Sequence, residues 1–194
     1  MAKEHNSIQP LAFSSDSNPP FGSSPKTRPG SRPSTGAWAA ESNGVIEADT
    51  LSSDHLAQYL STPQGYTIEP IDQETMALLT RPDRSTGAFP NADAFLKHGL
   101  GYCVLYDGQP VGFALSYATY NSGIEIDLWI HEAHRRQGLA TTVSAHLITT
   151  CLDRGLEPHW DAANDESANL AEKLGYRRVE HYRMLRRLLP NEVP

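Results

Sequence analysis

The residues best suited to chemistry stand close together in the stretch GIEIDLWIHEAHRRQGLAT, residues 123–141. Its first half alternates apolar and polar residues, which predicts a strand with two different faces. The apolar face carries Ile124, Ile126, Leu128 and Ile130, and the polar face carries Glu125, Asp127, Trp129 and His131. Carboxylates so placed can take a proton from a substrate or hold a cationic group. The polar face therefore indicates a cleft or, alternatively, a sheet with one solvated face.

A turn with two arginines and a glycine follows this strand. Arg135-Arg136-Gln137-Gly138 leads into a helix that we expect to run from Arg136 to Arg154, with Gly155 after its last turn. The first turn of a helix leaves backbone N–H groups without intrahelical partners at the positive end of the helix dipole. Gly138 lets a ligand approach the backbone closely, and the arginines add positive charge. The turn therefore predicts a binding site for a pyrophosphate.

The elements that must position these residues follow from the same periodicities. Ahead of the strand we expect helices, strands and one hairpin, at Asp49–Tyr59, Tyr66–Ile71, Asp72–Thr80, Asn91–Leu100, Tyr102–Tyr106 and Val111–Thr119. The Asp107-Gly108 pair between the last two is a hairpin turn signal. Behind the long helix we expect a strand, a helix and two strands, at Glu157–Asp161, Glu166–Leu174, Tyr176–Val179 and Tyr182–Leu189. A meander followed by β-α-β-α-β predicts a mixed α/β sheet.

The first 44 residues differ in composition from the rest of the chain. They contain nine serines, six prolines and four glycines, but only five large apolar residues. Such a segment buries too little apolar surface to offset the entropy lost on ordering. We therefore expect residues 1–44 to be disordered and residues 45–194 to form one domain.

The composition of the 194-residue chain argues against several functions. Its net charge of −7 does not favour nucleic acid as a partner. No apolar run reaches the roughly 18 residues that a membrane span needs, and the N-terminus lacks the apolar segment of a secretory signal. Cys103 and Cys151 are too few for a disulfide framework or a four-thiolate zinc site. We expect both to be reduced thiols of a cytoplasmic protein.

His131-Glu132-Ala133-His134 is a near match to a zinc-binding motif. H-E-x-x-H places two histidines one helical turn apart, whereas here the histidines are three residues apart at the end of a strand. We therefore expect no metal site.

Two ordered blocks of the sequence resemble the GNAT acetyltransferases. Arg135, Gly138 and Ala140 match the family's (Arg/Gln)-x-x-Gly-x-(Gly/Ala) motif, and WDAANDESANLAEKLGY, residues 160–176, resembles its next strand and helix. The resemblance spans Gly65–Arg178 and is closest to one bacterial branch of the family. It implies a mostly antiparallel central sheet flanked by helices, with splayed central strands that bind acetyl-CoA.

The resemblance also implies cofactor contacts, residue by residue. The arm of acetyl-CoA would pair with the backbone of Leu128, Trp129 and Ile130. The pyrophosphate would lie on the turn formed by Arg135, Arg136, Gln137, Gly138, Leu139, Ala140 and Thr141. Asn164 matches a helix-opening asparagine that contacts the cofactor arm, a role compatible with a plain N-cap, and Ser167 lies one turn further.

The reaction that this resemblance implies is direct attack of a substrate amine on the thioester. It needs a base for the amine proton, a donor to the carbonyl oxygen and an acid for the thiolate. Glu125 is the first candidate for the base and Asp127 competes with it, while the N–H of Ile130 is the expected donor. The tyrosine that many GNAT enzymes use as the acid is replaced by Ala171. The remaining candidates for the acid are Tyr176, Tyr182, Ser167 or a water.

The leading prediction is N-acetylation of a primary amine of a small molecule. The Ser/Pro-rich N-terminal segment suggests an alternative, a protein acetyltransferase secreted as a bacterial effector, and Ala171 suggests another, a CoA-binding module without catalysis. The oligomeric state stays open, with a homodimer among the alternatives. Trp129 is either a substrate platform or a core residue. The basic cluster either contacts the cofactor's 3′-phosphate or forms a solvated face; it consists of Arg177, Arg178, Arg183, Arg186 and Arg187.

Overall fold

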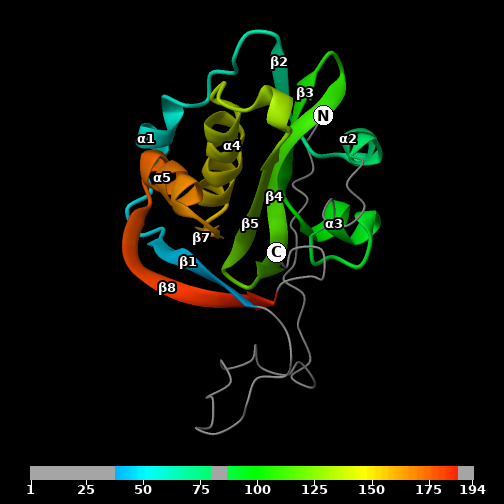
Figure 1. The fold of residues 1–194 in the computed structure, drawn as a ribbon. Helices are drawn as coiled ribbons and strands as arrows, with labels where there is room; N and C mark the ends of the chain where they lie inside the picture. Colours follow the sequence, from blue (N-terminus) through cyan, green and yellow to red (C-terminus); the bar gives the residue numbers. More distant parts are fainter. Residues whose placement is uncertain (1–37, 80–86, 188–194) are drawn as a thin grey trace, which may run out of the picture. The chain divides into compact units, whose positions relative to one another are not determined.

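A five-stranded sheet forms the centre of the fold (Figure 1). The computed structural model describes residues 38–79 and 87–187. The strand order is β2-β3-β4-β5-β6, formed by Tyr66–Pro70, Gly101–Tyr106, Gln109–Tyr120, Gly123–Ile130 and Glu157–His159. Neighbouring strands are antiparallel except β5 and β6, which are parallel. This arrangement confirms the predicted mixed α/β class and its mostly antiparallel sheet.

The predicted hairpin joins β3 to β4. Asp107 and Gly108 have φ angles of 48° and 71°. Positive φ at both central residues is the geometry of a two-residue turn that matches the twist of the strands. The turn sets the register, in which Tyr106 lies opposite Gln109.

Helices cover both faces of this sheet (Figure 1). On one face, α4 (Leu139–Asp153) packs its apolar side on β3, β4 and β5 through Val143, Leu147 and Cys151. The helices α2 (Gln73–Leu78) and α3 (Ala92–His98) lie on the other face, where Phe95 packs near Phe113. Covering both faces explains why the middle of β4, residues 111–116, is buried.

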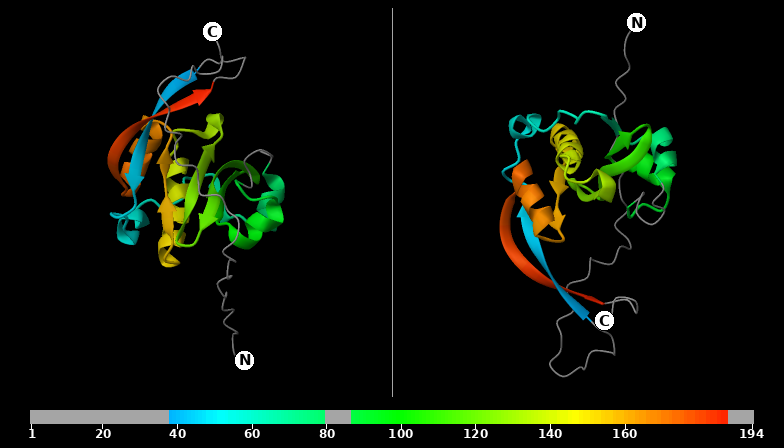
Figure 2. Two further views of the ribbon diagram at one scale, coloured as in Figure 1. Left: turned by 90° about the horizontal axis from the view of Figure 1, so that it is seen from below. Right: turned by 45° about the horizontal axis from the view of Figure 1, so that its top comes forward.

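A second sheet of three strands lies beside α5 (Asp165–Leu174) and α1 (Ser53–Ala57). Its order is β7-β1-β8, formed by Asp161–Ala162, Trp38–Glu47 and Arg177–Arg187. Figure 2 shows β1 and β8 running side by side, and their register extends from Trp38 opposite Arg187 to Glu47 opposite Arg177. Ile46 and Leu56 pack with Leu174 in the core between these elements.

Four sequence predictions need correction. The disordered segment was expected to reach residue 44, but β1 begins at Trp38, because its backbone pairs with β7 and β8. Residues 1–37 lie outside the described part of the chain. The strand expected over Glu157–Asp161 is divided between two sheets, and the two expected final strands are one, β8. The helix expected over Asp49–Tyr59 is the short α1.

None of the helices within residues 38–79 and 87–187 is both long and apolar enough to span a bilayer.

The position of β1 predicts how two truncations differ. Removing residues 1–37 should change the melting temperature by less than about 2 °C, because that segment holds few large apolar residues. Removing residues 1–47 should lower it by more than about 10 °C or prevent folding, since β1 is the central strand of its sheet and contributes Ile46 to the core. Thermal unfolding followed by circular dichroism measures both. Equal melting temperatures would contradict the assignment of β1 to the fold.

Candidate active site

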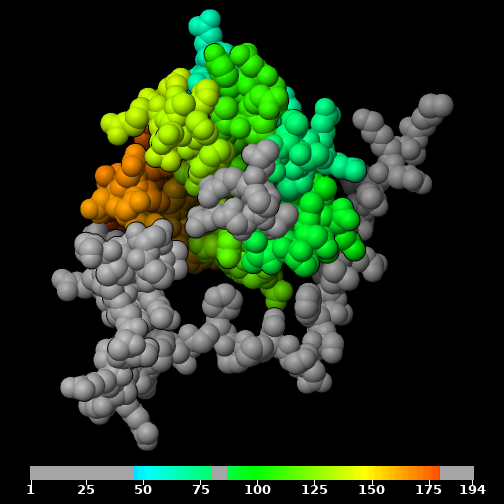
Figure 3. All heavy atoms as spheres, turned by 45° about the vertical axis from the view of Figure 1, so that its right-hand side comes forward, coloured from blue at the N-terminus to red at the C-terminus, as the bar shows by residue number. Residues whose placement is uncertain are grey.

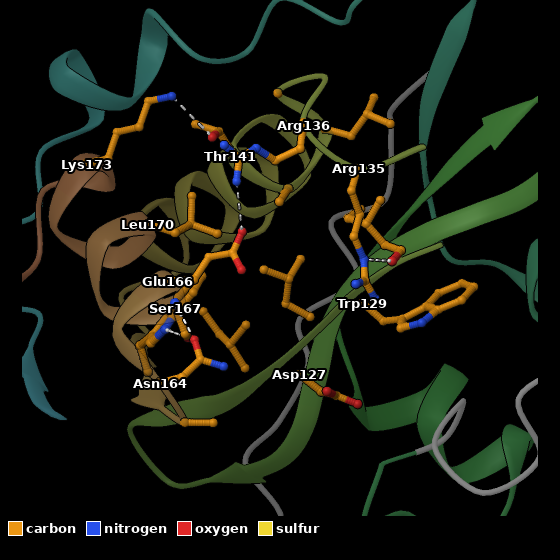
Figure 4. A pocket seen from close by; sticks show the side chains of 18 of the residues that line it. Asp127, Trp129, Arg135, Arg136, Thr141, Asn164, Glu166, Ser167, Leu170 and Lys173 are labelled. Carbon is orange, nitrogen blue, oxygen red and sulfur yellow. Dashed lines mark hydrogen bonds and ion pairs between the residues drawn. The ribbon is translucent and has the colours of Figure 1, made fainter. Parts of the chain in front are cut away.

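A cavity opens where the two sheets separate. β6 pairs with β5 only over Gly123–Glu125, and after His159 the chain crosses to the other sheet as β7. No strand among the described residues pairs with β5 on that side from Ile126 to Ile130. The resulting cavity has a volume of about 640 Å³ and is lined by β5, the start of α4 and one face of α5 (Figure 4). Its size suits a small organic ligand.

The unpaired edge of β5 offers backbone groups to this cavity. The N–H of His131 donates to the carbonyl of Val111 on β4, 2.8 Å away. Because backbone groups alternate along a strand, Trp129 and Asp127 also direct theirs to β4, while Leu128 and Ile130 direct theirs to the cavity side. Of the three residues predicted to pair with an extended ligand, two therefore have suitable backbone groups. Trp129 also lines the cavity, but its N–H and carbonyl are directed to β4.

The side chain of Arg135 hydrogen-bonds to one of these backbone groups, the carbonyl of Ile130. Its Nε donates to the carbonyl oxygen of Ile130 at 3.0 Å, so the side chain folds back over the end of β5. The arginine therefore caps the strand as well as lining the cavity. The sequence suggested only its charge.

The turn before α4 leaves open space at Gly138. This residue is the N-cap of α4 and has a φ of +82°, a conformation that favours glycine. A Cβ built on it would meet no heavy atom within 4 Å. Arg136 also has a positive φ, +64°, which is uncommon for a side-chain-bearing residue. Figure 3 shows this turn and the start of α4 next to α5 on one face of the molecule. The N–H groups of the first turn of α4 therefore have room for an anion.

Contacts far apart in sequence hold this turn in place. The hydroxyl of Tyr66 on β2 lies 3.0 Å from Gln137 Oε1, to which it donates, and 2.9 Å from His134 Nδ1. The rings of Tyr106 and His134 pack at 5.1 Å between centroids. Gln137 thus supports the turn from outside, since it does not line the cavity. The histidine of the near-miss zinc motif is likewise part of this anchor.

The wall formed by α5 presents polar groups to the cavity. Asn164 is the N-cap of α5, and its Oδ1 accepts the N–H of Ser167 at 2.9 Å. The indole Nε1 of Trp160 donates to Ser167 Oγ at 3.0 Å. Since an indole N–H can only donate, the Ser167 hydroxyl accepts from it and keeps its own proton for another acceptor. Both predicted residues, Asn164 and Ser167, line the cavity.

The sequence missed other residues of this wall. Glu166, Leu170 and Lys173 also line the cavity from α5. Leu170 and Lys173 follow Ser167 at steps of three along the helix, a spacing that places side chains on neighbouring parts of one face. That spacing was the signal that would have found them.

The two candidate bases occupy different positions. Asp127 lines the cavity, whereas Glu125 lies where β5 and β6 still pair, with its Oε2 3.9 Å from His159 Nδ1. Burial raises the pKa of Glu125; His159 opposes the rise and Asp161, which lines the cavity, adds to it. The raised pKa of Glu125 favours a role as proton acceptor, and Asp127 is the carboxylate residue of the two that lines the cavity.

Tyr176 is placed in the core and not in the cavity lining. It is 4% exposed, and its hydroxyl donates to the carbonyl of Pro158 at 2.8 Å. Burial raises its pKa well above the ordinary value for tyrosine. This position corrects the prediction that Tyr176 is an acid for the reaction. Ala171 is also fully buried in the core, and the side chain of Tyr182 lies outside the described residues.

Trp129 has a mixed role in the structure. Its ring packs against Phe113 on the sheet face covered by α2 and α3, with 5.7 Å between ring centroids. The same residue lines the cavity. The packing favours the core alternative for the ring.

The arginines at the start of β8 have carboxylate partners. Arg177 pairs with Glu47 and with Asp49, the latter at 2.8 Å. Arg178 pairs with Asp165 at 3.3 Å and with Glu172 at 3.1 Å. Neither lines the cavity, and these ion pairs favour the alternative in which the start of β8 is a surface face over a phosphate contact. The side chains of the other three arginines of the basic cluster lie outside the described residues.

Comparison with known proteins identifies the family. A family model named GNAT acetyltransferase matches residues 40–185 of the chain. The chain belongs to the GNAT acetyltransferase family. The match includes β5, the turn before α4, and α5, which are the elements around the cavity.

Individual GNAT relatives agree with this assignment. The chain is 35% identical to a GCN5-related N-acetyltransferase-like protein of Streptococcus suis 89/1591, with a TM-score of 0.73 over 78% of this chain and 63% of that one. It is 28% identical over 127 residues to YdfB of Bacillus subtilis (strain 168), described as an uncharacterized N-acetyltransferase; these residues are 63% of this chain and 49% of YdfB. A GCN5-related N-acetyltransferase of Kribbella flavida shares the fold, with a TM-score of 0.50 and 19% identity over 76% of this chain and 57% of that one. The chain thus spans about half the length of the curated relative that it matches.

The open space at Gly138 predicts a selective effect of one substitution. Gly138→Glu should raise the dissociation constant of acetyl-CoA by at least about 100-fold, since it places bulk and negative charge beside the first amides of α4. Calorimetric titration of the purified variant measures it.

Gly155→Glu is a matched control for this variant. Gly155 follows the other end of α4, also has a positive φ, +67°, and a Cβ there also meets nothing within 4 Å. Backbone strain is therefore similar, but the cavity is untouched. Equal weakening by both variants, or near-normal affinity of folded Gly138→Glu, would contradict the anion site.

Proposed function

We propose that this protein transfers the acetyl group of acetyl-CoA to a primary amine of a small molecule. The observation that carries the proposal is the presence, in one cavity, of an unpaired strand edge and the start of a helix. Acetyl-CoA has an amide-bearing arm and a pyrophosphate, which match a strand edge and a helix N-terminus respectively. The thioester supplies the activated acetyl group. Family membership supports the same reaction class.

In this proposal the cofactor arm lies along the cavity side of β5. The N–H of Ile130 and the carbonyl of Leu128 hydrogen-bond to its amides at the end of β5 nearest α4. The N–H of Leu128, which lies nearer Glu125 than the expected donor Ile130 does, stabilises negative charge on the carbonyl oxygen of the thioester. The N–H groups at the start of α4 hold the pyrophosphate, with Arg135 and Arg136 adding positive charge. Asn164 and Ser167 contact the arm from the opposite wall.

Two carboxylates of β5 act on the substrate amine, one by accepting its proton and one by attracting its charged form. An amine attacks only in its neutral form, so the ammonium must first lose a proton. Glu125 accepts it, through water, at the end of the cavity where β5 and β6 part, and Asp127 attracts the ammonium within the cavity. The amine nitrogen then bonds to the acetyl carbon as the carbon–sulfur bond breaks. Ser167, whose hydroxyl proton is not used by Trp160, is our candidate to donate a hydrogen bond to the sulfur.

The acceptor class is tested by a panel of amines. Purified full-length protein is incubated with acetyl-CoA and small primary amines in one arm, and with lysine-containing peptides in the other, and release of free thiol is followed. Turnover with small amines supports the proposal. Turnover with peptides only would favour a protein acetyltransferase, and tight binding of acetyl-CoA with no turnover in either arm would favour a non-catalytic module.

Substituting the two carboxylates tests their roles. Glu125→Gln keeps size and polarity but removes the proton acceptor, so kcat should fall by about 10²–10⁴-fold while the dissociation constant of acetyl-CoA stays the same. Because the pKa of Glu125 is raised, the wild-type rate should fall with acid at a pH above the usual glutamate range, and this limb should vanish in the variant.

Asp127→Asn is the comparison for that variant. It should mainly raise KM for a cationic amine, since Asp127 is assigned to attraction and not to proton transfer. Full kcat in Glu125→Gln together with a large loss of kcat in Asp127→Asn would make Asp127 the base. Full kcat in both variants would remove the carboxylates from the mechanism.

A further inference from the structure

Lys173 lies at the edge of the cavity beside the start of α4. It sits in the last turn of α5, and it lines the cavity together with Leu170 and Ser167 (Figure 4). Its Nζ donates to Thr141 Oγ1 at 3.4 Å. Thr141 is the third residue of α4, so the ammonium group stands next to the N–H groups of the first helical turn. Positive charge from the lysine and from the helix end therefore acts on the same space.

Within the described part of the chain, the ammonium group of Lys173 has a hydroxyl and an aromatic ring as neighbours and no carboxylate partner. Nζ lies 5.3 Å from the centre of the Tyr59 ring, within the range of a cation–π contact. No carboxylate of the described residues lies within 4.0 Å of it. By contrast, Arg136 at the cavity has Glu166 at 3.9 Å. An ammonium has three donors, and Thr141 uses one of them here.

Helix α1 fixes the end of α5 that carries this lysine. His55 Nε2 donates to the carbonyl oxygen of Lys173 at 2.9 Å, and Thr50 Oγ1 donates to the carbonyl of Gly175 at 2.7 Å. The N–H of Tyr59 donates to the carbonyl of Leu56, a fully buried residue of α1. The aromatic ring and the backbone below the lysine are thus held by the same short segment. The backbone from which the Lys173 side chain extends and the Tyr59 ring beside its ammonium group are therefore both fixed in position.

We propose that Lys173 binds a phosphate group of the cofactor and that Tyr59 positions its ammonium group for this purpose. The proposal rests on the proposed function, because it assumes that acetyl-CoA occupies the cavity. It assigns a binding role outside the Arg-Gly turn. A phosphate supplies the negative charge that the described residues do not place beside this ammonium group.

Binding of CoA and of dephospho-CoA, which lacks the 3′-phosphate, tests the proposal. Calorimetry on the full chain compares wild type with Lys173→Met, which removes the charge and keeps most of the stem. CoA affinity should fall about 5- to 20-fold, the range for a charge-assisted hydrogen bond at an exposed position. Lys173→Arg should restore most of the affinity. A loss for CoA alone identifies the 3′-phosphate, and an equal loss for both ligands identifies the pyrophosphate.

Two control variants separate local binding from general effects. Lys97→Met removes one positive charge from α3, away from the cavity, and should change affinity less than twofold. Tyr59→Phe should keep the affinity, and Tyr59→Leu should weaken it about two- to fivefold, because only the latter removes the aromatic ring.

Three results would overturn the assignment of Lys173. They are unchanged affinity of Lys173→Met for both ligands, equal weakening by Lys97→Met, and failure of Lys173→Arg to restore binding in a folded protein. If the wild-type protein bound neither CoA nor dephospho-CoA, the proposed function itself would fail. If wild type and Lys173→Met both bound them normally, only the assignment of Lys173 would fail.

Discussion

The candidate site depends on the point at which the chain leaves one sheet for the other. β6 pairs with β5 over three residues, and after Trp160 the chain continues as β7 in the other sheet. Trp160 is 4% exposed, donates to Ser167 and packs on Tyr176, whose hydroxyl in turn binds the Pro158 carbonyl. A buried aromatic pair with satisfied polar tips is a stable way to hold two sheets apart. The edge of β5 is exposed to the cavity because of this separation.

The charged side chains around the cavity have different partners and lie in different parts of it. Arg135 is bound to the end of β5, Arg136 has Glu166 beside it, and Lys173 has a hydroxyl and an aromatic ring. The chain as a whole carries a net charge of −7, so an anionic ligand depends on these local cations and on helix dipoles. The carboxylates Asp127 and Asp161 line other parts of the same cavity. One cavity thus has a cationic part and an anionic part, which the proposed function assigns to the cofactor and to the amine.

Local patterns predicted much of this fold. The alternation in residues 123–130, the Asp107-Gly108 turn and the helix patterns that follow Asp72, Asn91 and Asn164 depend on neighbours within a few positions, and the structure has each element there. What the sequence could not show depends on contacts between distant residues. β1 is a strand because of pairing with β8, 130 or more positions away, and Tyr66 anchors the turn at His134 across 68 positions. A tyrosine can act as an acid, so the sequence made Tyr176 a candidate, and only its burial in the core shows that it lies away from the cavity.

The central claim is that acetyl-CoA lies along the unpaired edge of β5 with its phosphates at the start of α4. A crystal structure of the full chain with CoA measures this directly. The account predicts hydrogen bonds from the cofactor arm to the backbone of Leu128 and Ile130, and phosphate oxygens within hydrogen-bond distance of the first amides of α4. CoA bound elsewhere on the protein, or bound in the cavity with β5 still unpaired from Ile126 to Ile130, would contradict it.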